Sequence, residues 1–252
     1  MRHLYANFLK KYCGPIFTDH LYPDARSYTE NGFRYHMHEI FNTPPEAIEW
    51  LEKNHSKLWY RSGFGEKSKC DYLTNNVSES LNNQIKGSKG LLLHELLDTL
   101  RVMVMQKMAL RRDVGRQFKE GEILPNVMKE LNAASQNLRV VKVARGDADF
   151  AEVTLMCADN IARRHTMDLK NHTCSCRRWQ LTGKPCWHAL AWIRSNRGVK
   201  IEDFVHPYYS VNKFKAAYAG IVPSLTYRTQ WPVCGPGIHC VFSQAEERTW
   251  EA

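Results

Sequence analysis

The sequence predicts an α+β fold, in which a mainly helical region precedes a small ββα unit. Three observations support this. An apolar stripe with helical spacing begins near residue 93, short alternating segments fill residues 139–170, and a proline then introduces the helical pattern CWHALAWIRSN. The sequence pattern changes from helical spacing to short alternation near residues 139–150. We therefore expect a helical domain over 1–140, a small module over 141–200 and an irregular extension over 201–252.

Three helices are predicted in the first half of the chain. Residues 1–13 place apolar and aromatic side chains at helical spacing. The segment TPPE, from Thr43 to Glu46, combines a capping threonine, prolines in the first turn and a glutamate at the third position, so a helix should follow to about His55. After Gly87 to Gly90 comes a helix whose apolar stripe consists of Leu93, Leu96, Leu97, Leu100, Val104 and Met108.

The second half begins with a helix from Pro125 to about Leu138. From residue 139 to residue 170 the pattern predicts a hairpin, with Val153, Leu155 and Cys157 on one face, followed by Met167 and Leu169. A short helix follows Pro185. The part after about Pro207 is aromatic and contains proline and glycine, which indicates an irregular extension.

Composition narrows the class of protein. The chain has 252 residues, 43% of them hydrophobic, which is enough to bury a core. Its formal net charge of +9 and pI near 9.1 favour an anionic partner, with nucleic acid first and an acidic membrane second. Since the sequence shows neither an apolar membrane-spanning run nor a signal peptide, we expect a soluble intracellular chain.

Eight cysteines in a reducing compartment are more often metal ligands or reactive thiols than a disulfide framework. Cys13, Cys70 and Cys157 are scattered, and we interpret them as ordinary buried thiols. Cys234, His239 and Cys240 offer only three ligands at an awkward spacing, which argues against a second metal site.

The segment CSCRRWQLTGKPCWH supplies four metal-ligand side chains within fifteen residues: Cys174, Cys176, Cys186 and His188. Three thiolates and one imidazole close a tetrahedral Zn²⁺ shell without a water position, which indicates one structural zinc ion. Unrelated thiols would not share so compact a spacing, and a redox pair would more typically be Cys-x-x-Cys. We place the first pair at the end of a strand and the second in the first turn of the next helix, whose N–H groups would stabilise the Cys186 thiolate.

This arrangement resembles the SWIM zinc finger, whose pattern is CxCx(n)CxH, and in particular the type found in plant Mutator-like transposases. Trp179, Pro185 and the alanines at 189 and 191 are also in the style of that family. The upstream segments RHLYANFLKKY, PPEAIEWLEKNHSKLWYRSGF and CDYLTNNVSESLNNQIK resemble the second half of such a transposase, so the similarity covers residues 2–218. It implies the mainly helical C-terminal part of an RNase H-like domain, with its sheet largely missing, followed by the SWIM module.

The family resembles RNase H-like transposases that hold divalent ions with two aspartates and a glutamate. Its TNNxxES pattern places the glutamate on Glu79. The alternative is structural, since Glu79 would be the third helical residue after a capping Asn76.

Both catalytic aspartates of the family lie upstream of an element whose histidine matches His3. Asp19, Asp24 and Asp71 do not match their positions. We therefore expect no strand-transfer activity, and Mg²⁺ only if a complete catalytic domain exists.

Basic and aromatic residues lie among the zinc ligands. Arg177, Arg178 and Lys184 are candidates for contacts with DNA phosphates, and an exposed Trp179 or Trp187 would stack on a base. Alternatively, the tryptophans form the core of the module and the arginines a solvated face. The Arg111, Arg112 and Arg116 cluster is a weaker candidate, because cations at a helix end are usually only solvated and also suit the helix dipole.

Three classes of function remain open. The first is a nuclear, zinc-binding and DNA-binding derivative of a Mutator-like transposase. The second is a regulatory module derived from such a transposase, with protein partners. The third is an active transposase whose N-terminal half is missing from the sequence in hand. None of the three involves a membrane.

Overall fold

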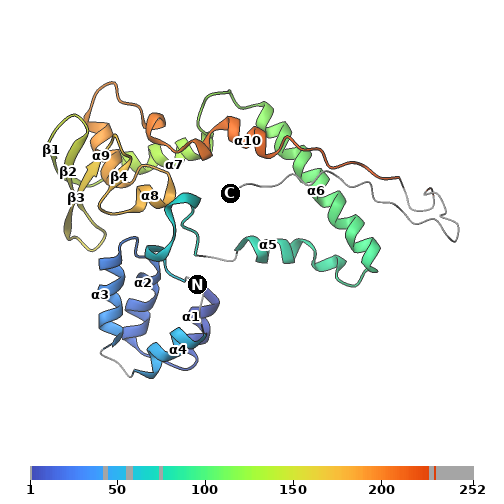
Figure 1. Ribbon diagram of the computed structural model, residues 1–252, viewed down its shortest axis with the longest axis horizontal. Coiled ribbons are helices and arrows are strands. Elements are labelled where there is room, and N and C mark those ends of the chain that lie inside the picture. The colour runs from blue at the N-terminus through green and yellow to red at the C-terminus, as the bar shows by residue number, and fades with distance from the viewer. Residues whose placement is uncertain (1, 42–44, 55–58, 74–75, 227–229, 231–252) are drawn as a thin grey trace.

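A computed structural model describes residues 2–41, 45–54, 59–73, 76–226 and 230. Figure 1 shows a helical block near the N-terminus, a module with a small sheet, and a long helical arm. The mixed α and β composition agrees with the predicted class. No helix in the described ranges is long and apolar enough to cross a membrane.

The N-terminal block contains four helices: α1 (Arg2–Leu9), α2 (Tyr22–Arg26), α3 (Glu30–Phe41) and α4 (Glu46–Asn54). A π-helical turn at Phe17–Leu21 leads into α2. The apolar spacing of α1 buries Leu4 and Phe8 against the other helices. The Phe8 ring meets those of Phe17 and Trp50 edge-on at 5.0 and 5.7 Å. Both predicted helices are present, although Thr43, Pro44 and His55 lie outside the described residues.

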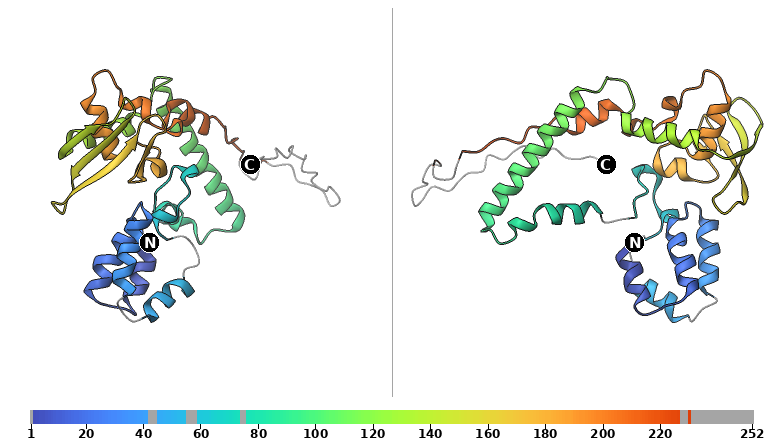
Figure 2. Two further views of the ribbon diagram at one scale, coloured as in Figure 1. Left: turned by 60° about the vertical axis from the view of Figure 1, so that its left-hand side comes forward. Right: turned by 180° about the vertical axis from the view of Figure 1, so that it is seen from behind.

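The arm consists of α5 (Asn76–Gln84) and α6 (Leu93–Arg116). Figure 2 shows from behind that both helices extend away from the other two parts. The predicted α6 helix forms, but its apolar stripe is not covered by the described residues, because Leu93 is 72% and Leu97 57% exposed. The only described helix in close packing with α6 is α10 (Val211–Ala217).

The third part begins with α7 (Pro125–Gln136) and continues into an antiparallel sheet, whose four strands in the described chain follow sequence order. They are β1 (Val140–Arg145), β2 (Phe150–Met156), β3 (Ala162–Asp168) and β4 (Thr173–Cys174). The predicted hairpin is β2–β3, which pairs from Phe150↔Asp168 to Met156↔Ala162. Strand β1 was not predicted, whereas β4 ends at Cys174, as expected from the placement of the first cysteine pair at the end of a strand. The module therefore has more strands than a ββα unit.

Two helices follow the sheet: α8 (Arg178–Thr182) and the predicted α9 (Trp187–Ser195). Val153, Leu155 and Met167 on the inner face of the sheet pack with Trp192 and Ile193 of α9 in one buried cluster. Leu190, on another side of α9, packs against Leu131 of α7. The sheet, α9 and α7 thus form successive layers.

The segment after residue 200 is more regular than predicted. It contains two 3₁₀ turns, Ile201–Phe204 and Pro207–Tyr209, before α10. The Ser210 hydroxyl caps α10 by accepting a hydrogen bond from the Lys213 N–H at 3.2 Å. Short-range hydrogen bonding by serine thus creates a helix that apolar spacing did not reveal.

The scattered cysteines differ from the prediction. Cys13 and Cys70 are exposed and Cys157 is half-buried. The interpretation of buried thiols was therefore wrong for the first two, because each lies in a loop rather than on an inward-facing helix or strand position.

Candidate metal centre

Strand β4 and the turn after it position the first two cysteines. Cys174 ends β4, paired with Met167 of β3. Arg177 adopts a left-handed conformation with φ of 58°, and its N–H donates to the Cys174 carbonyl at 2.8 Å. The Gln180 amide holds the Cys174 backbone, accepting from its N–H at 3.2 Å and donating to its carbonyl at 3.0 Å. This tight turn brings Cys176 to the same side as Cys174.

Helix α9 positions the other two ligand candidates. Cys186 is the residue before the helix and His188 is its second residue. The Cys186 side chain makes no capping hydrogen bond, contrary to the predicted stabilisation of its thiolate by the helix N–H groups. Between the two pairs of ligand candidates the chain turns back at Gly183, whose φ of +68° favours glycine. A Cβ at this position would lie only 2.8 Å from His206 Cβ.

The structure brings the four predicted residues together. The three sulfur atoms and one imidazole nitrogen all lie within 4.8 Å of one another. His188 Nδ1 is 3.7 Å from Cys174 Sγ and 3.9 Å from Cys186 Sγ. A tetrahedral zinc ion separates its ligand atoms by roughly 3.5 to 3.8 Å, as follows from Zn–S and Zn–N distances near 2.3 and 2.0 Å. The donor set and its spacing therefore fit Zn²⁺.

Burial and mutual hydrogen bonding set the protonation of the thiols. Cys174 and Cys186 are only 2% and 1% exposed. Hydrogen bonds from Cys174 and Cys186 hold the pKa of Cys176 well below its usual range. The hydrogen bond to Cys176 raises the pKa of Cys174 to about 12, and burial raises that of Cys186. One thiolate is thus already favoured, and a bound cation would favour the other two.

His165 is a neighbour of the cluster that the sequence interpretation missed. It lies on β3 opposite Val153, and its ring centroid is 4.4 Å from that of His188. Its Nδ1 is 2.9 Å from Ser175 Oγ. Burial and the neighbouring His188 lower the pKa of His165. Alternate residues of a strand face the same side, so His165 shares the inward face of β3 with Met167. This alternation is the sequence pattern that would have identified His165.

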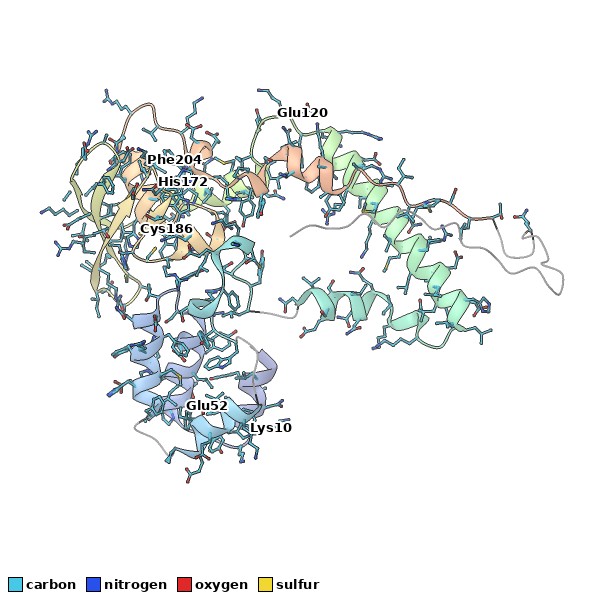
Figure 3. The ribbon with its side chains drawn as sticks, viewed as in Figure 1. Lys10, Glu52, Glu120, His172, Cys186 and Phe204 are labelled. Carbon is cyan, nitrogen blue, oxygen red and sulfur yellow. The ribbon has the colours of Figure 1, made fainter. Side chains whose placement is uncertain are left out.

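The two tryptophans differ in role. Trp179 is 2% exposed, donates from Nε1 to the Phe204 carbonyl at 3.2 Å and stacks on His172 with a centroid distance of 5.2 Å. Figure 3 labels His172, Cys186 and Phe204 close together in this module. Trp179 therefore belongs to the core, as the structural alternative proposed. Trp187 is 51% exposed.

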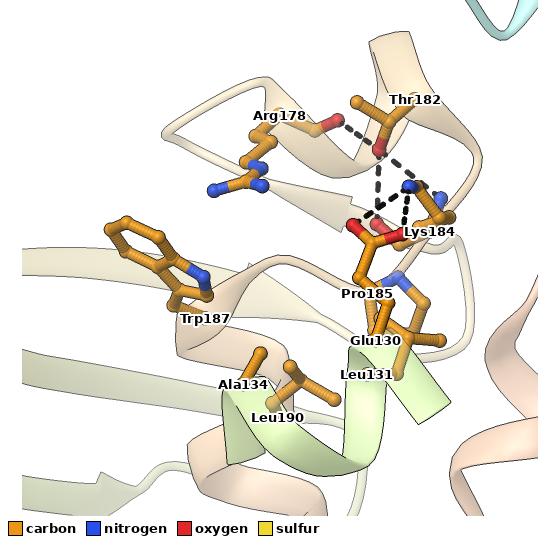
Figure 4. A pocket seen from close by; sticks show the side chains of 9 residues that line it. All are labelled: Glu130, Leu131, Ala134, Arg178, Thr182, Lys184, Pro185, Trp187 and Leu190. Atoms are coloured by element: carbon orange, nitrogen blue, oxygen red, sulfur yellow. Dashed lines mark hydrogen bonds and ion pairs between the residues drawn. The ribbon is translucent and has the colours of Figure 1, made fainter. Parts of the chain in front are cut away.

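The predicted phosphate contacts are only partly available. Arg177 pairs with Glu66 at 3.3 Å and donates to the Ser62 carbonyl at 2.8 Å. Lys184 donates to both carboxylate oxygens of Glu130 at 3.0 and 2.9 Å. Figure 4 shows that ion pair on one side of a small pocket, with Arg178 and Trp187 on the other.

Arg178 differs from Arg177 and Lys184 in its partners. Its guanidinium lies 4.8 Å from the Trp187 ring centroid and 5.8 Å from that of Tyr28. It is half-buried and makes no ion pair with a described carboxylate. Arg178 and Trp187 therefore form a partly exposed cationic and aromatic pair beside the metal centre.

The carboxylates singled out in the sequence do not meet at one site. Glu79 is half-buried in the first turn of α5, which begins at Asn76, so the predicted cap is already the first helical residue. Asp24 is buried in α2, and Asp71 accepts a 2.6 Å hydrogen bond from the Tyr28 hydroxyl. Among the described residues, the Cys₃His cluster is the one group suited to a metal ion. The side chain of His3, and Cys234, His239 and Cys240, lie outside the described part.

Comparison with known families agrees with this geometry. A search of curated proteins and a search of solved structures each gave no match. One family model does match, over residues 157–192, and its description is the SWIM zinc finger. All four residues of the Cys₃His cluster lie inside that range. Residues 157–192 thus match a SWIM zinc finger, which supports a bound zinc ion in this module.

Proposed function

We propose that this protein is a zinc-binding and DNA-binding derivative of the C-terminal part of a Mutator-like transposase. Cys174, Cys176, Cys186 and His188 hold one structural Zn²⁺. The observation that carries the zinc assignment is the convergence of three sulfur atoms and one His188 ring nitrogen within 4.8 Å, inside the range of the family match.

The centre is structural rather than hydrolytic. Four protein ligands complete a tetrahedral shell, so no open position remains to bind and activate water. The ligands also connect β4 to the start of α9, and two of the cysteines belong to the buried cluster beneath the sheet. The bound ion supplies a fixed link between these elements, and the surrounding residues then present their exposed side chains.

DNA contact is assigned to the partly exposed pair beside the zinc centre. Trp187 offers a partly open ring for stacking on a base, and Arg178 offers a guanidinium for a phosphate. SWIM zinc fingers serve as DNA-binding or protein-binding modules, and the net charge of +9 favours the nucleic acid. Nuclear localisation follows from this function and is part of the proposal.

Binding to a short duplex, measured by fluorescence anisotropy over a range of salt concentrations, tests the proposal. Trp187→Ala and Arg178→Gln should each weaken binding by roughly tenfold, equivalent to about 1.4 kcal/mol. Phe41→Ala removes a similarly exposed aromatic ring from α3, and Arg34→Gln removes a more exposed arginine that pairs with Glu30; both serve as controls. Equal binding by the zinc-centre variants and their controls would contradict the assignment.

The transposase origin implies no strand transfer by this chain. The resemblance assigns Glu79 the position of the catalytic glutamate, but one carboxylate cannot organise two Mg²⁺ ions. Supercoiled DNA should remain uncut when incubated with the protein and Mg²⁺. Nicking that disappears in Glu79→Ala would restore the catalytic interpretation and favour a longer active transposase.

A second candidate function is a transposase-derived regulatory module that binds proteins. The exposed apolar side chains along α6 favour it, since such a stripe is usually covered by another surface. Pull-down from a nuclear extract, compared for the wild type and a Leu93→Gln/Leu97→Gln variant, separates the two functions. Loss of protein partners with unchanged DNA affinity would favour the regulatory module.

A further inference from the structure

The C-terminal end of α6 and helix α10 border an open hollow of about 210 Å³, whose lining surface is mostly apolar although four of its six residues are cationic. The lining comprises Arg111, Arg112, Gly115, Arg116, Lys215 and Ala219. Figure 3 labels Glu120 in the loop that joins this end of α6 to the next helix. Sequence alone did not link Lys215 to the arginine cluster a hundred residues earlier. We call this feature the α6–α10 pocket.

Close packing of the two helices creates the α6–α10 pocket. Gly115 is buried, and a Cβ at that position would lie 3.4 Å from the Phe214 ring and 3.6 Å from Lys215 Cγ. These are ordinary van der Waals distances, so α10 packs directly against the last turn of α6. The Phe214 ring also contacts the rings of Phe118 and Tyr218, at centroid distances of 5.9 and 4.8 Å. These contacts hold α10, which carries Lys215, against the end of α6.

The four cations have different partners. Arg112 donates to the Tyr218 and Gly220 carbonyls at 3.3 and 2.6 Å, so it fixes the chain that leaves α10. Arg116 pairs with Asp113, and Lys215 with Glu120, but these carboxylates are 62% and 75% exposed. Exposed pairs of this kind contribute little and exchange partners readily. Arg111 is exposed and has no ion pair or hydrogen bond within the described residues.

The helix dipole accounts for only part of this arrangement. Its influence falls off within the last turn, and Arg111 and Arg112 precede the last turn of α6, which ends at Arg116. Lys215 belongs to a different helix. The α6–α10 pocket has four cationic residues and two exposed carboxylates nearby. The resulting net positive charge would be offset by a bound anion.

We infer that the α6–α10 pocket binds phosphate groups of the nucleic acid backbone, as a second contact separate from the zinc centre. Arg111 and Arg116 carry the exposed guanidinium groups, and Lys215 contributes from the opposite helix. Guanidinium groups match phosphate oxygens in a bidentate geometry. The inference rests on the proposed DNA binding and adds a site that reads phosphates without reading sequence.

The test compares Arg111→Gln/Arg116→Gln with the control Arg34→Gln/Lys53→Gln. Both double variants lose the same charge, and the control residues lie on exposed positions of the N-terminal helices. With a duplex of mixed sequence, the pocket variant should lower the slope of log affinity against log salt by about 1.8, and affinity at 0.1 M salt by tenfold or more. Identical slopes for the pocket variant and the control would overturn the inference.

A second ligand, tripolyphosphate, tests the α6–α10 pocket separately from DNA binding at the zinc centre. Tripolyphosphate should raise the unfolding temperature of the wild type and of Trp187→Ala, but not of Arg111→Gln/Arg116→Gln. A response in Trp187→Ala supports the pocket even if the assignment at the zinc centre fails. Loss of DNA affinity in Trp187→Ala, together with no effect of the pocket variant in either assay, would retain the proposed function and refute the pocket.

Discussion

Individual residues affect this structure in two ways. Some are candidate metal ligands that link its elements, and others are polar groups whose burial lowers the stability of the fold. The four metal ligands are placed by their own local conformations, such as the left-handed turn at Arg177 and the helix start at Cys186. Asp24 belongs to the second kind. It is fully buried, and neither of its carboxyl oxygens has a hydrogen-bond partner in the described part of the chain.

Burial raises the pKa of Asp24 from 3.8 to about 8. The folded state therefore holds this proton more tightly than the unfolded state does. The contribution of Asp24 to the free energy of unfolding should be largest below about pH 4 and fall as pH rises towards 8, by roughly 1.4 kcal/mol per pH unit at most. Urea unfolding between pH 4 and pH 9 measures this trend.

Asp24→Asn should remove most of that dependence and stabilise the protein near pH 8. Asp19→Asn, at an exposed position one turn earlier, is the matched control and should keep the wild-type profile. Identical profiles for the wild type and Asp24→Asn would show that the Asp24 carboxylate is solvated.

Gly183 is the second residue for which we predict a large effect. A Cβ there would meet His206 Cβ at 2.8 Å in a left-handed conformation, so Gly183→Ala should cost about 2 to 4 kcal/mol. Gly198 has a similar φ of +85° but open space around it, and Gly198→Ala should cost only about 1 kcal/mol. Denaturant unfolding of both variants in excess zinc separates crowding from backbone strain. Equal losses would mean that crowding at Gly183 is relieved by small shifts.

At the scale of elements, the metal ligands connect pieces that have little stability alone. Strand β4 has two residues and α8 has five, and both depend on the cluster formed by Cys174, Trp179 and Cys186. Such short elements are marginal in water without tertiary support. The N-terminal helices have a separate core, built from residues such as Phe8 and Leu51.

Zinc removal should therefore melt the module over residues 150–195 and leave the N-terminal helices folded. The expected loss is on the order of 10 kcal/mol of metal-binding free energy. Limited proteolysis and circular dichroism after chelation test this, and Cys186→Ser should mimic it, with the wild type binding one zinc ion per chain. Unchanged protection of residues 150–195 after complete metal removal would sink the prediction.

At the scale of the whole molecule, the loop between the second and third cysteines joins the zinc module to the N-terminal half. Arg177 contacts Glu66 and the Ser62 carbonyl, and Lys69 Nζ donates to the Gln180 carbonyl at 3.0 Å. The Tyr209 hydroxyl lies between the Lys69 carbonyl at 3.2 Å and the Thr182 carbonyl at 2.7 Å. Segment 59–73 is therefore held in part by a loop that lies between two candidate metal ligands, Cys176 and Cys186.

Arg177→Ala should increase amide hydrogen exchange in residues 61–69, while zinc content stays at one ion per chain. The reason is that the substitution removes two contacts to this segment without touching a ligand. Arg164→Ala, which removes the exposed pair with Glu152 on the sheet, is the control. Unchanged exchange in both variants would show that the remaining contacts of this segment, such as those of Lys69 and Arg61, suffice to hold it.

How far each feature could be predicted depends on the range of the interactions behind it. Periodicity located α6, α7 and the β2–β3 hairpin, because their apolar side chains recur along the chain. It missed β1, whose Val140 and Val141 are exposed and whose pairing with β2 is interrupted by an irregularity. The two-residue strand β4 was expected only as the strand end that carries the first cysteine pair. His165 was missed because a histidine among the arginines of β3 reads as a solvated residue.

The sequence by itself identified the candidate metal centre, because all four ligand candidates lie within fifteen residues and local turns suffice to bring them together. Only the tertiary structure decided which basic residues remain available to a partner. Arg177 and Lys184 are occupied by carboxylates from Glu66 and Glu130, which are distant in sequence, whereas Lys215 joins the arginines of α6. The physical reason is that electrostatic pairing depends on distance in space, and spacing along the chain carries no information about it.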